Sequence, residues 1–408
     1  MSYNIHQQPG QYRPAYNDLI FVVSSSNNAQ LNFNYFADIY IVGVTDPIRL
    51  KAPVHPTYGS GVFNAGRVIE NYVNSDISKT TYGFQKNLNS FASYRVDFGE
   101  EYGPSSGVIQ YSGITSTAYK YVWNGVLDFL DVNTYTMQSY SADSGTVLSE
   151  NIDRYLELTQ DAWLYFYSND TTSYDTAHVL AYNSTGGVIR GVEIANPYTS
   201  SGTIGNHFLR FSSGANNLNM ISSGSTSGYI TSTIGSGLII PANTYKYTIQ
   251  FDGASASPYF THYITTLCKY PTNRLHFLNE LGAFESFNFT KLSKKKIDVT
   301  RSKYKAPYGA LTSASSFSYN NSDRLERTFF TSMKEGLSLK SDWITEAEHE
   351  WLQELITSPE IYLDDPTFGL VAVSCNINTI DVKTVLNDKL FNLSIDLEYS
   401  FNRYRQRY

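Results

Sequence analysis

The stretch LHFLNELGAFESFNFTKLSKKKIDVTRSKY, residues 275–304, places two apolar and aromatic runs on either side of a small turn, Asn279–Gly282. A lysine triplet, Lys294–Lys296, follows directly. Two such runs around a Gly-bearing turn predict a β-hairpin. No residues with a familiar catalytic spacing stand in this stretch. The hairpin is therefore expected to serve assembly rather than chemistry.

Alternation of apolar and polar residues predicts further strands. In FNLSIDLEYSF, residues 391–401, every odd residue is apolar or aromatic and every even one is polar, which indicates a half-buried strand. Residues 245–251 alternate in the same way. Residues 163–167 predict one strand, and residues 178–194 predict two strands around a turn at Ser184–Gly187.

Two more segments of this region are expected to be strands. HFLRF (207–211) and NLNMI (217–221) are short apolar runs on either side of Ser212–Asn217. Many short strands with Gly-bearing turns are typical of a β-sandwich or barrel.

Two helices are predicted from their first residues. Asn64 can cap a short helix with an apolar stripe of Val68, Ile69, Tyr72 and Val73. Thr345 and Glu348 have the spacing of a capping box, and Ser358-Pro359 ends the helix near 345–357.

These patterns predict a mainly β protein with two to three antiparallel β-sandwich or barrel domains and a few short helices. At 408 residues the chain exceeds the size of one ordinary core. We expect a β-rich structural domain at 1–135 and a sandwich at 136–266 that is rich in Ser, Thr, Gly and Tyr. A C-terminal β-domain with one helix is expected at 267–408.

The composition limits the class of protein. Charged residues make up 16% of the chain, against roughly 25% in typical soluble domains, while 34 Tyr and 23 Phe supply rigid contact area. A net charge of −7 argues against a nucleic-acid partner. The N-terminus lacks an apolar core of signal-peptide length, and no run approaches 18 apolar residues. We therefore expect synthesis in a cytoplasm without a classical signal, and no membrane insertion.

The search for chemistry predicts no catalytic residue, metal site or cofactor. No phosphate-binding, dinucleotide-binding, zinc-protease or serine-hydrolase motif is present, and the seven histidines are scattered. The carboxylates Glu100 and Glu101 are interpreted as solvated loop charges. Cys268 and Cys375 are expected to be buried thiols, with a single bridge as the alternative.

Two groups of residues, the rings of Trp163, Tyr165 and Tyr167 and the lysine triplet, each have two interpretations. Trp163, Tyr165 and Tyr167 share one face of a predicted strand, which favours core, but rings in a Ser/Asn-rich sandwich can also contact a glycan. The lysine triplet is interpreted first as a solvated edge that blocks unwanted strand pairing. An anionic partner is the alternative.

Several stretches together resemble virion structural proteins of tailed phages that infect Bacteroidota. They are YRPAYNDLIFVVSSSN, FNYFADIYI, RLKAPVHPTYGSGVFNAGRVIENYV, YRVDFGEEYG, YVWNGVLDF, LNELGAFESFNF and ITEAEHEWLQELITSPEIYL. The resemblance covers the first 135 residues and about the last 140, and is weaker between them. It implies a non-catalytic, β-rich subunit of a tail, tail tip or baseplate, located in the virion and present in several copies in a symmetric ring.

The two lines of argument lead to one hypothesis and one alternative. The first is a phage tail subunit that binds copies of itself and other virion proteins through aromatic-rich interfaces, which favour Tyr, Phe and Trp over Lys and Glu. Phe277, Phe284, Phe287 and Phe289 of the hairpin are predicted to lie in such an interface. The alternative is a receptor-binding, adhesin-like protein whose middle sandwich recognises host surface polysaccharide.

Overall fold

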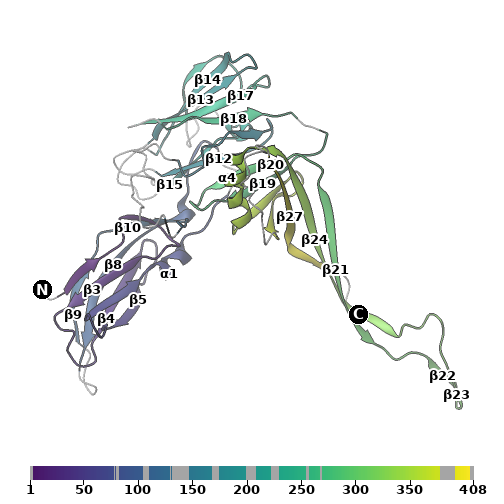
Figure 1. Cartoon of the computed structure of the whole chain (residues 1–408), viewed down its shortest axis with the longest axis horizontal. Coiled ribbons are helices and arrows are strands. Elements are labelled where there is room, and N and C mark those ends of the chain that lie inside the picture. The colour runs from purple at the N-terminus through teal and green to yellow at the C-terminus, as the bar shows by residue number, and fades with distance from the viewer. Residues whose placement is uncertain are drawn as a thin grey trace. The chain divides into compact units, whose positions relative to one another are not determined.

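The computed structural model describes residues 3–77, 79, 82–103, 110–128, 130, 147–167, 174–198, 208–221, 229–253, 257–266, 269–376 and 391–404. The protein is mainly β with a few short helices, which confirms the predicted fold class. Its backbone forms two compact units (Figure 1). Unit 1 is Met1–Thr266 with Leu278–Glu285, and unit 2 is Leu267–Phe277 with Ser286–Tyr408.

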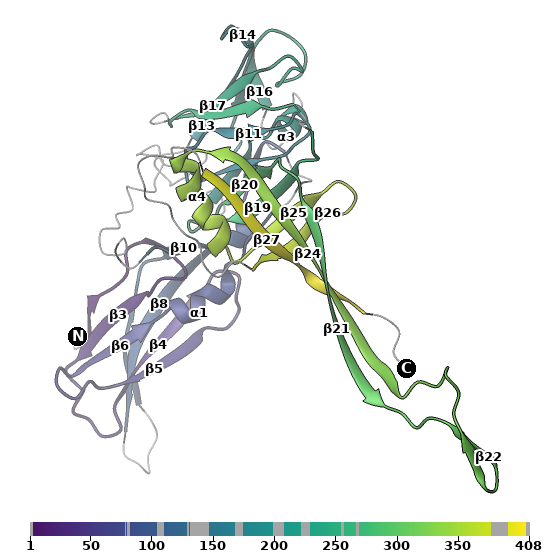
Figure 2. The ribbon, with the colours of Figure 1, turned by 45° about the vertical axis from the view of Figure 1, so that its right-hand side comes forward.

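Unit 1 begins with a sandwich of two sheets (Figure 2). The smaller sheet has the order β1 (Tyr3–Gln7), β3 (Ile20–Ser25), β6 (Ser60–Asn64). The larger has the order β2 (Tyr12–Pro14), β10 (Lys120–Trp123), β8 (Phe91–Tyr102), β4 (Asn34–Ile41), β5 (Ile48–Pro53), with β9 (Gln110–Ser116) also paired to β8. Pairing is antiparallel except between β2 and β10.

The core of this first sandwich follows from period-two alternation. Buried and half-buried residues alternate along β3, so that Phe21 and Val23 point to the same side. The ring of Phe98 on β8 lies 5.2 Å from Phe21 and 5.7 Å from Phe63, measured between ring centroids. Each such fully buried ring stabilises the fold by about 1.5–3 kcal/mol.

The predicted helix after Asn64 is present. It comprises α1 (Gly66–Ile69) and the 3-10 turn η1 (Glu70–Tyr72), and a second 3-10 turn, η2, spans Leu88–Ser90. The Asn64 Oδ1 atom accepts hydrogen bonds from the backbone N–H groups of Gly66 and Leu19. Ile69 and Val73 of the predicted stripe are buried in the sandwich core, whereas Val68 is half-buried and Tyr72 is exposed.

The second sandwich of unit 1 also has a large and a small sheet. The large sheet has the order β11 (Arg154–Leu156), β18 (Phe260–Ile264), β17 (Lys246–Gly253), β13 (Tyr174–Tyr182), β14 (Val188–Ala195), β16 (Tyr229–Ile234). The small one has the order β12 (Trp163–Tyr167), β15 (Phe208–Ser212), β7 (Phe84–Lys86). Strand β7 therefore comes from the first 135 residues of the chain. The ring of Phe84 lies 4.7 Å from Phe211 and 6.2 Å from Phe251.

The prediction of a strand at NLNMI was wrong. Its first residues belong to the helix α3 (Ala215–Asn219). Asn217 donates to the Ala162 carbonyl, and the Asn219 side chain both accepts from the N–H and donates to the C=O of Ile240. These side-chain bonds tie the helical turn to backbone that is distant in the sequence, so the apolar spacing within the segment does not reveal the turn.

The seven-stranded sheet of unit 2 has the order β20 (Phe284–Phe289), β19 (Asn273–Leu278), β25 (Ile361–Asp365), β26 (Gly369–Cys375), β27 (Phe391–Tyr404), β24 (Glu326–Ile344), β21 (Lys294–Lys305). A separate small hairpin joins β22 (Ala310–Ser313) to β23 (Ser316–Ser318). The hairpin and the alternating strand predicted from the sequence are therefore β19–β20 and β27. The turn of the β19–β20 hairpin, with the strand ends beside it (Leu278–Glu285), belongs to unit 1.

The helix α4 (Glu346–Thr357) packs its apolar stripe on this sheet. The predicted capping box is present, because the Thr345 hydroxyl accepts from the Glu348 N–H while Glu348 accepts from the Thr345 N–H. Trp351 is buried, with its ring 5.6 Å from Phe277 and 6.1 Å from Phe287.

Candidate assembly arm and sheet groove

A long two-stranded ribbon extends from the sheet of unit 2. We call residues 294–331 the arm: they comprise β21, a tip that contains β22 and β23, and the start of β24. β21 pairs with β24 from Lys294 opposite Ser338 to Lys305 opposite Glu326. β27 pairs with β24 only from Ser332 onward. Beyond that point the ribbon has two strands and runs out from the sheet (Figures 1 and 2).

The lysine triplet lies at the start of the arm. β21 is the edge strand of the sheet, and all of its residues are exposed. The interpretation of Lys294–Lys296 as part of a solvated strand edge is confirmed. An edge strand rich in lysine resists pairing with the edge of another sheet.

The arm exposes large apolar side chains. Leu311 at the tip is 73% exposed, and Tyr319 is 67% exposed. The other large apolar side chains that are exposed on the arm are Ile297, Val299, Tyr304, Tyr308, Phe317, Leu325 and Phe329. Two-stranded ribbons are marginally stable in water, and contiguous exposed apolar patches mark interaction sites. The arm therefore has the character of a surface that another molecule covers.

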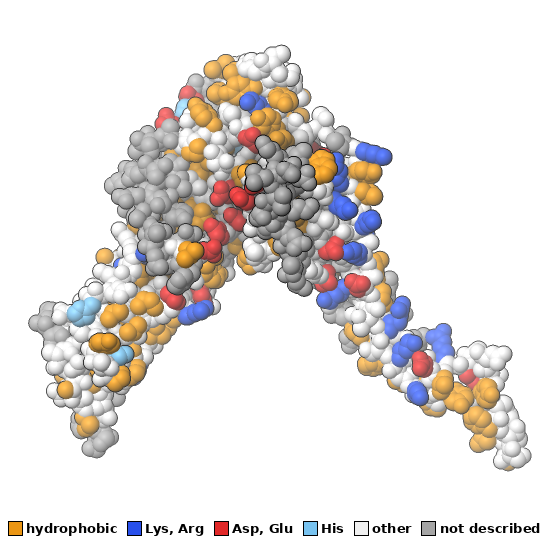
Figure 3. All heavy atoms as spheres, viewed as in Figure 1, with side chains coloured by type: hydrophobic (Ala, Val, Ile, Leu, Met, Phe, Trp, Pro, Cys, Tyr) orange, Lys and Arg blue, Asp and Glu red, His pale blue; other side chains and the backbone are white. Residues whose placement is uncertain are grey.

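The arm is also basic. It carries eight Lys and Arg against three Asp and Glu, a formal charge of +5, so the rest of this −7 chain carries −12. Figure 3 shows basic side chains along the arm and apolar ones near its end. Lys303 pairs with Glu326 at 3.3 Å within the arm. No ion pair joins Arg301, Arg324 or Arg327 to a residue that the structure describes.

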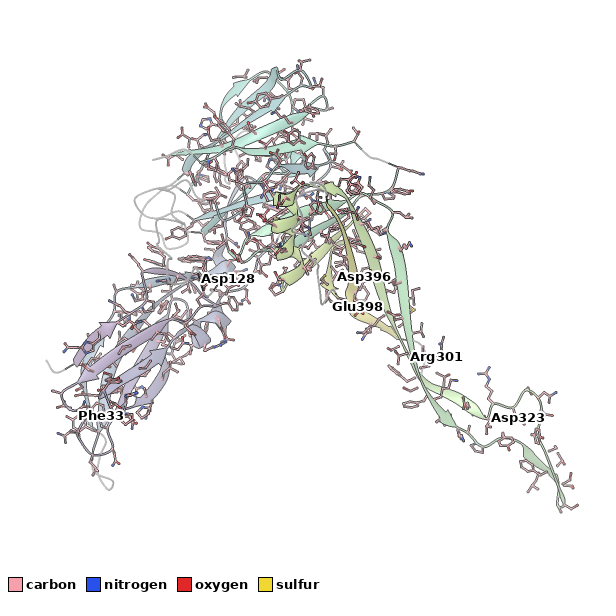
Figure 4. All side chains as sticks on the ribbon, in the orientation of Figure 1. Phe33, Asp128, Arg301, Asp323, Asp396 and Glu398 are labelled. Atoms are coloured by element: carbon pink, nitrogen blue, oxygen red, sulfur yellow. The ribbon has the colours of Figure 1, made fainter. Side chains whose placement is uncertain are left out.

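Ion pairs between strands hold the base of the arm to the sheet. The Lys296 Nζ atom lies 2.5 Å from Asp396 Oδ2, and Lys334 Nζ lies 3.4 Å from Glu398 Oε2. Figure 4 places Asp396 and Glu398 on β27, and Arg301 farther out on the arm. Hydrogen bonds from Lys296 and Ser338 keep the pKa of Asp396 below its ordinary value. Both partners of the closer pair are about half exposed, so it contributes less than about 1 kcal/mol.

Unit 2 also carries a strongly acidic segment. Residues 342–365, which include α4, contain eight Asp and Glu and no Lys or Arg. We call them the acidic segment. Glu346 and Glu350 are exposed, lie one helical turn apart, and make no hydrogen bond or ion pair with a described residue. Trp343, directly before the helix, is 65% exposed.

The second sandwich has an open groove of about 360 Å³ on the face of its large sheet. His178 lies at its centre, with its Nδ1 atom 3.6 Å from Glu193 Oε1 and its Nε2 atom 3.7 Å from Asp252 Oδ2. Gly191 lines the groove without a side chain, and a Cβ atom there would approach Leu180 Cδ2 to 3.0 Å. The other lining residues are Val192, Ile234, Thr248, Gln250 and Tyr259. Such carboxylates, an amide and an exposed ring can bind the hydroxyls and C–H face of a sugar.

The structure corrects the predicted sugar contact at Trp163, Tyr165 and Tyr167. These side chains are at most 3% exposed. The strand β12 is buried on both faces, and the ring of Tyr167 packs against Tyr12 at 5.2 Å. Burial raises the pKa of Tyr165 to about 12. The favoured interpretation of the three rings as core is therefore confirmed, and no ring face is open to a ligand.

The predicted subunit interface at the β19–β20 hairpin is corrected as well. Phe277, Phe284 and Phe289 are buried within the chain, at no more than 1% exposure, and Phe287 is half-buried. Trp351 of α4 packs against Phe277 and Phe287. The hairpin aromatics are therefore largely buried inside one copy rather than between copies.

The carboxylates Glu100 and Glu101 do not lie in a solvated loop. They belong to β8 and are buried. Glu101 forms an ion pair with Lys51 at 2.8 Å, and Glu100 accepts a hydrogen bond from Asn27.

The structure describes one of the two cysteines. Cys375 is half-buried at the end of β26. Cys268 and the predicted domain boundary at 135/136 lie outside the described residues.

Sequence reasoning missed both the exposed arm and the groove. Alternation along 294–305 was obscured by charges on both faces, although the burst of charge itself was a usable signal. The groove residues come from strands that are paired only in the fold: His178 lies opposite both Glu193 and Gln250. Only the order of the strands in the sheet shows that these three side chains are neighbours.

One deeply buried ion pair belongs to the framework of unit 1. Arg154 Nη2 lies 2.7 Å from Glu285 Oε2, and both side chains are at most 5% exposed. Burial raises the pKa of Glu285, although Arg154 partly opposes this shift.

Within the described part of the chain, no cluster of His, Cys, Asp and Glu suits a metal ion. No helix among the described residues is long and apolar enough to cross a membrane.

Comparison with known proteins finds no matching family model and no matching curated protein.

Proposed function

We propose that the protein is a non-catalytic structural subunit of a tailed-phage virion, in the tail, tail tip or baseplate. It acts through contacts with copies of itself and with other virion proteins, and it is made in the host cytoplasm. The sequence resemblance to virion proteins of Bacteroidota phages supplies the biological setting. The arm supplies the physical support.

The arm carries this proposal because its geometry suits binding to another molecule. Nine large apolar side chains on a narrow ribbon remain exposed in the single copy. Burying apolar surface contributes about 25 cal/mol per Å², so covering them on assembly would be strongly favourable. Assembly interfaces concentrate this kind of aromatic and aliphatic side chain.

The decisive experiment locates the chain in particles. Phage particles purified from a lysate are labelled with an antibody against the chain and imaged, with particles from an unrelated phage as the control. The proposal predicts label on the tail or its tip. Label on a capsid face contradicts the tail assignment, and absence of the chain from purified particles contradicts the virion role.

A second candidate function is recognition of host surface polysaccharide, and the groove on the second sandwich favours it. The groove combines hydrogen-bonding groups, including Glu193 and Asp252, with the ring of Tyr259, which is 57% exposed. Rings of this kind bind sugars by stacking, and carboxylates bind them by accepting hydrogen bonds from the hydroxyl groups.

This second function is tested by binding of the purified chain to host polysaccharide. Asp252→Asn and Tyr259→Ala are expected to weaken binding. Tyr245→Ala is the matched control, because Tyr245 is 50% exposed and lies outside the groove lining. Binding that is equal in all variants contradicts a glycan site in this groove.

A further inference from the structure

We infer that the arm of one copy binds the acidic segment of a second copy, an inference that rests on the proposed assembly role. The contact joins residues 294–331 of one chain to residues 342–365 of the next. It specifies the partner of the arm as a second copy of the same chain.

Charge complementarity is the first argument. The arm has a formal charge of +5, while the acidic segment contains eight carboxylates and no Lys or Arg. Arg324 and Arg327 near the tip, like Glu346 and Glu350 on α4, are exposed without an ionic partner among the described residues. Complementary charges that are unpaired in the single chain favour and orient association between copies.

Apolar complementarity is the second argument. Trp343 is 65% exposed at the start of the acidic segment, and Leu311, Phe317 and Tyr319 are at least 58% exposed at the arm tip. Trp and Tyr are the residues that most often dominate binding energy when a surrounding rim excludes water. The acidic segment and the arm therefore each carry exposed apolar side chains together with a net charge, negative on the segment and positive on the arm.

The reach of the chain keeps the arm tip away from α4 of the same copy. β24 runs from Glu326, in the arm, to Ile344, directly before α4. At about 3.3 Å per residue, its 19 residues span on the order of 60 Å. The two complementary surfaces therefore lie toward opposite ends of one strand, and Figures 1 and 2 show the arm leading away from α4.

The contact is head-to-tail, because two different surfaces meet. Such heterologous contacts close into a ring when the rotation per subunit divides the circle, and otherwise continue as a filament. The symmetric ring implied by the sequence resemblance is one product of this geometry.

Charge reversal tests the inference. Sedimentation velocity measures self-association of the wild type, of R324E/R327E, of E346K/E350K and of the chain with all four changes. Each double variant is expected to weaken association on the order of tenfold or more, and the quadruple variant to restore it. An equimolar mixture of the two double variants should also associate, because each arm then meets a segment of opposite charge on the other variant, and the two variants should alternate along the assembly.

Controls separate folding from binding. All four residues are exposed, so circular dichroism and unfolding temperature should be unchanged. Arg67→Glu, a reversal at a 79% exposed side chain of unit 1, should leave association intact. Higher salt should weaken association of the wild type, because it screens exposed charges.

The outcomes of this test and of the particle test are distinguishable. A wild-type chain that stays monomeric, or a quadruple variant that is not restored, overturns the contact between arm and acidic segment. If the chain is nevertheless found in particles, the virion role stands and the arm binds another virion protein. Restored association of a chain that is absent from particles supports the contact and contradicts the virion role.

Discussion

Replacing Arg154 with methionine should destabilise unit 1 strongly, because Arg154 neutralises the buried carboxylate of Glu285. Arg154 Nη2 contacts Glu285 Oε2 at 2.7 Å and also donates to the Glu150 carbonyl at 2.7 Å. Glu285 accepts a second hydrogen bond at 2.9 Å, from the Glu150 N–H. These bonds join the segment before β11 to the end of the β19–β20 hairpin that belongs to unit 1.

The magnitude follows from the burial of both partners. The Arg154 side chain is 5% exposed and the Glu285 side chain 0%. Removing one partner of such a pair leaves an uncompensated charge and costs about 3–5 kcal/mol. That loss is a large part of the roughly 5–15 kcal/mol that stabilises most domains. The double variant R154M/E285M should recover much of it, since two apolar side chains of similar volume replace the pair.

The effect should depend on pH in a defined direction. Burial raises the pKa of Glu285 in the folded state above its ordinary value of 4.5, so the folded state binds the proton more tightly. The stability that the protonated carboxyl contributes is complete below pH 4.5 and is lost as pH rises through the folded-state pKa. Without Arg154 this pKa rises further. The penalty of R154M should therefore grow from acidic toward neutral pH.

Urea unfolding of the wild type, R154M and R154M/E285M, near the ordinary pKa of 4.5 and near neutral pH, measures both effects. The reasoning is refuted if R154M at neutral pH unfolds within about 1 kcal/mol of the wild type. It is also refuted if the penalty is independent of pH, or if E285M does not relieve it.

Two further substitutions test the local geometry. Gly282→Ala should cost more than about 2 kcal/mol in thermal unfolding, since φ is +81° and a Cβ atom would overlap the Asn124 carbonyl. Gly186→Ala, with φ +84° and open space around it, should cost only about 1–2 kcal/mol, and equal losses at both glycines would contradict the overlap. Thr345→Ala should cost about 1 kcal/mol by removing the hydroxyl that accepts from the Glu348 N–H, and an unchanged unfolding temperature would argue against the capping box.

Local patterns in the sequence predicted many of the elements. The alternation over 391–401 gave β27, and the spacing of Thr345 and Glu348 gave the start of α4. Each of these signals lies within a few neighbouring residues. A strand or a cap can therefore be predicted before its partners are known.

Burial and neighbourhood were harder to predict, because they depend on distant segments. Nothing near Phe277 indicates that Trp351 covers it, and nothing near Phe84 indicates that it joins a strand that begins at Phe208. The hairpin aromatics were consequently assigned to an interface, although the structure buries three of the four. The exposed apolar residues lie instead on the arm, where charge masked their pattern.

The central claim is that another subunit covers the arm in the assembled particle, and footprinting with a photoactivated carbene tests it most directly. Labelling of Leu311, Phe317 and Tyr319 is compared between the purified chain and intact particles, with Tyr58, which is 80% exposed in unit 1, measured in parallel. The account predicts strong protection of the three tip residues in particles. Particles that contain the chain but label its arm tip as heavily as the purified chain would contradict it.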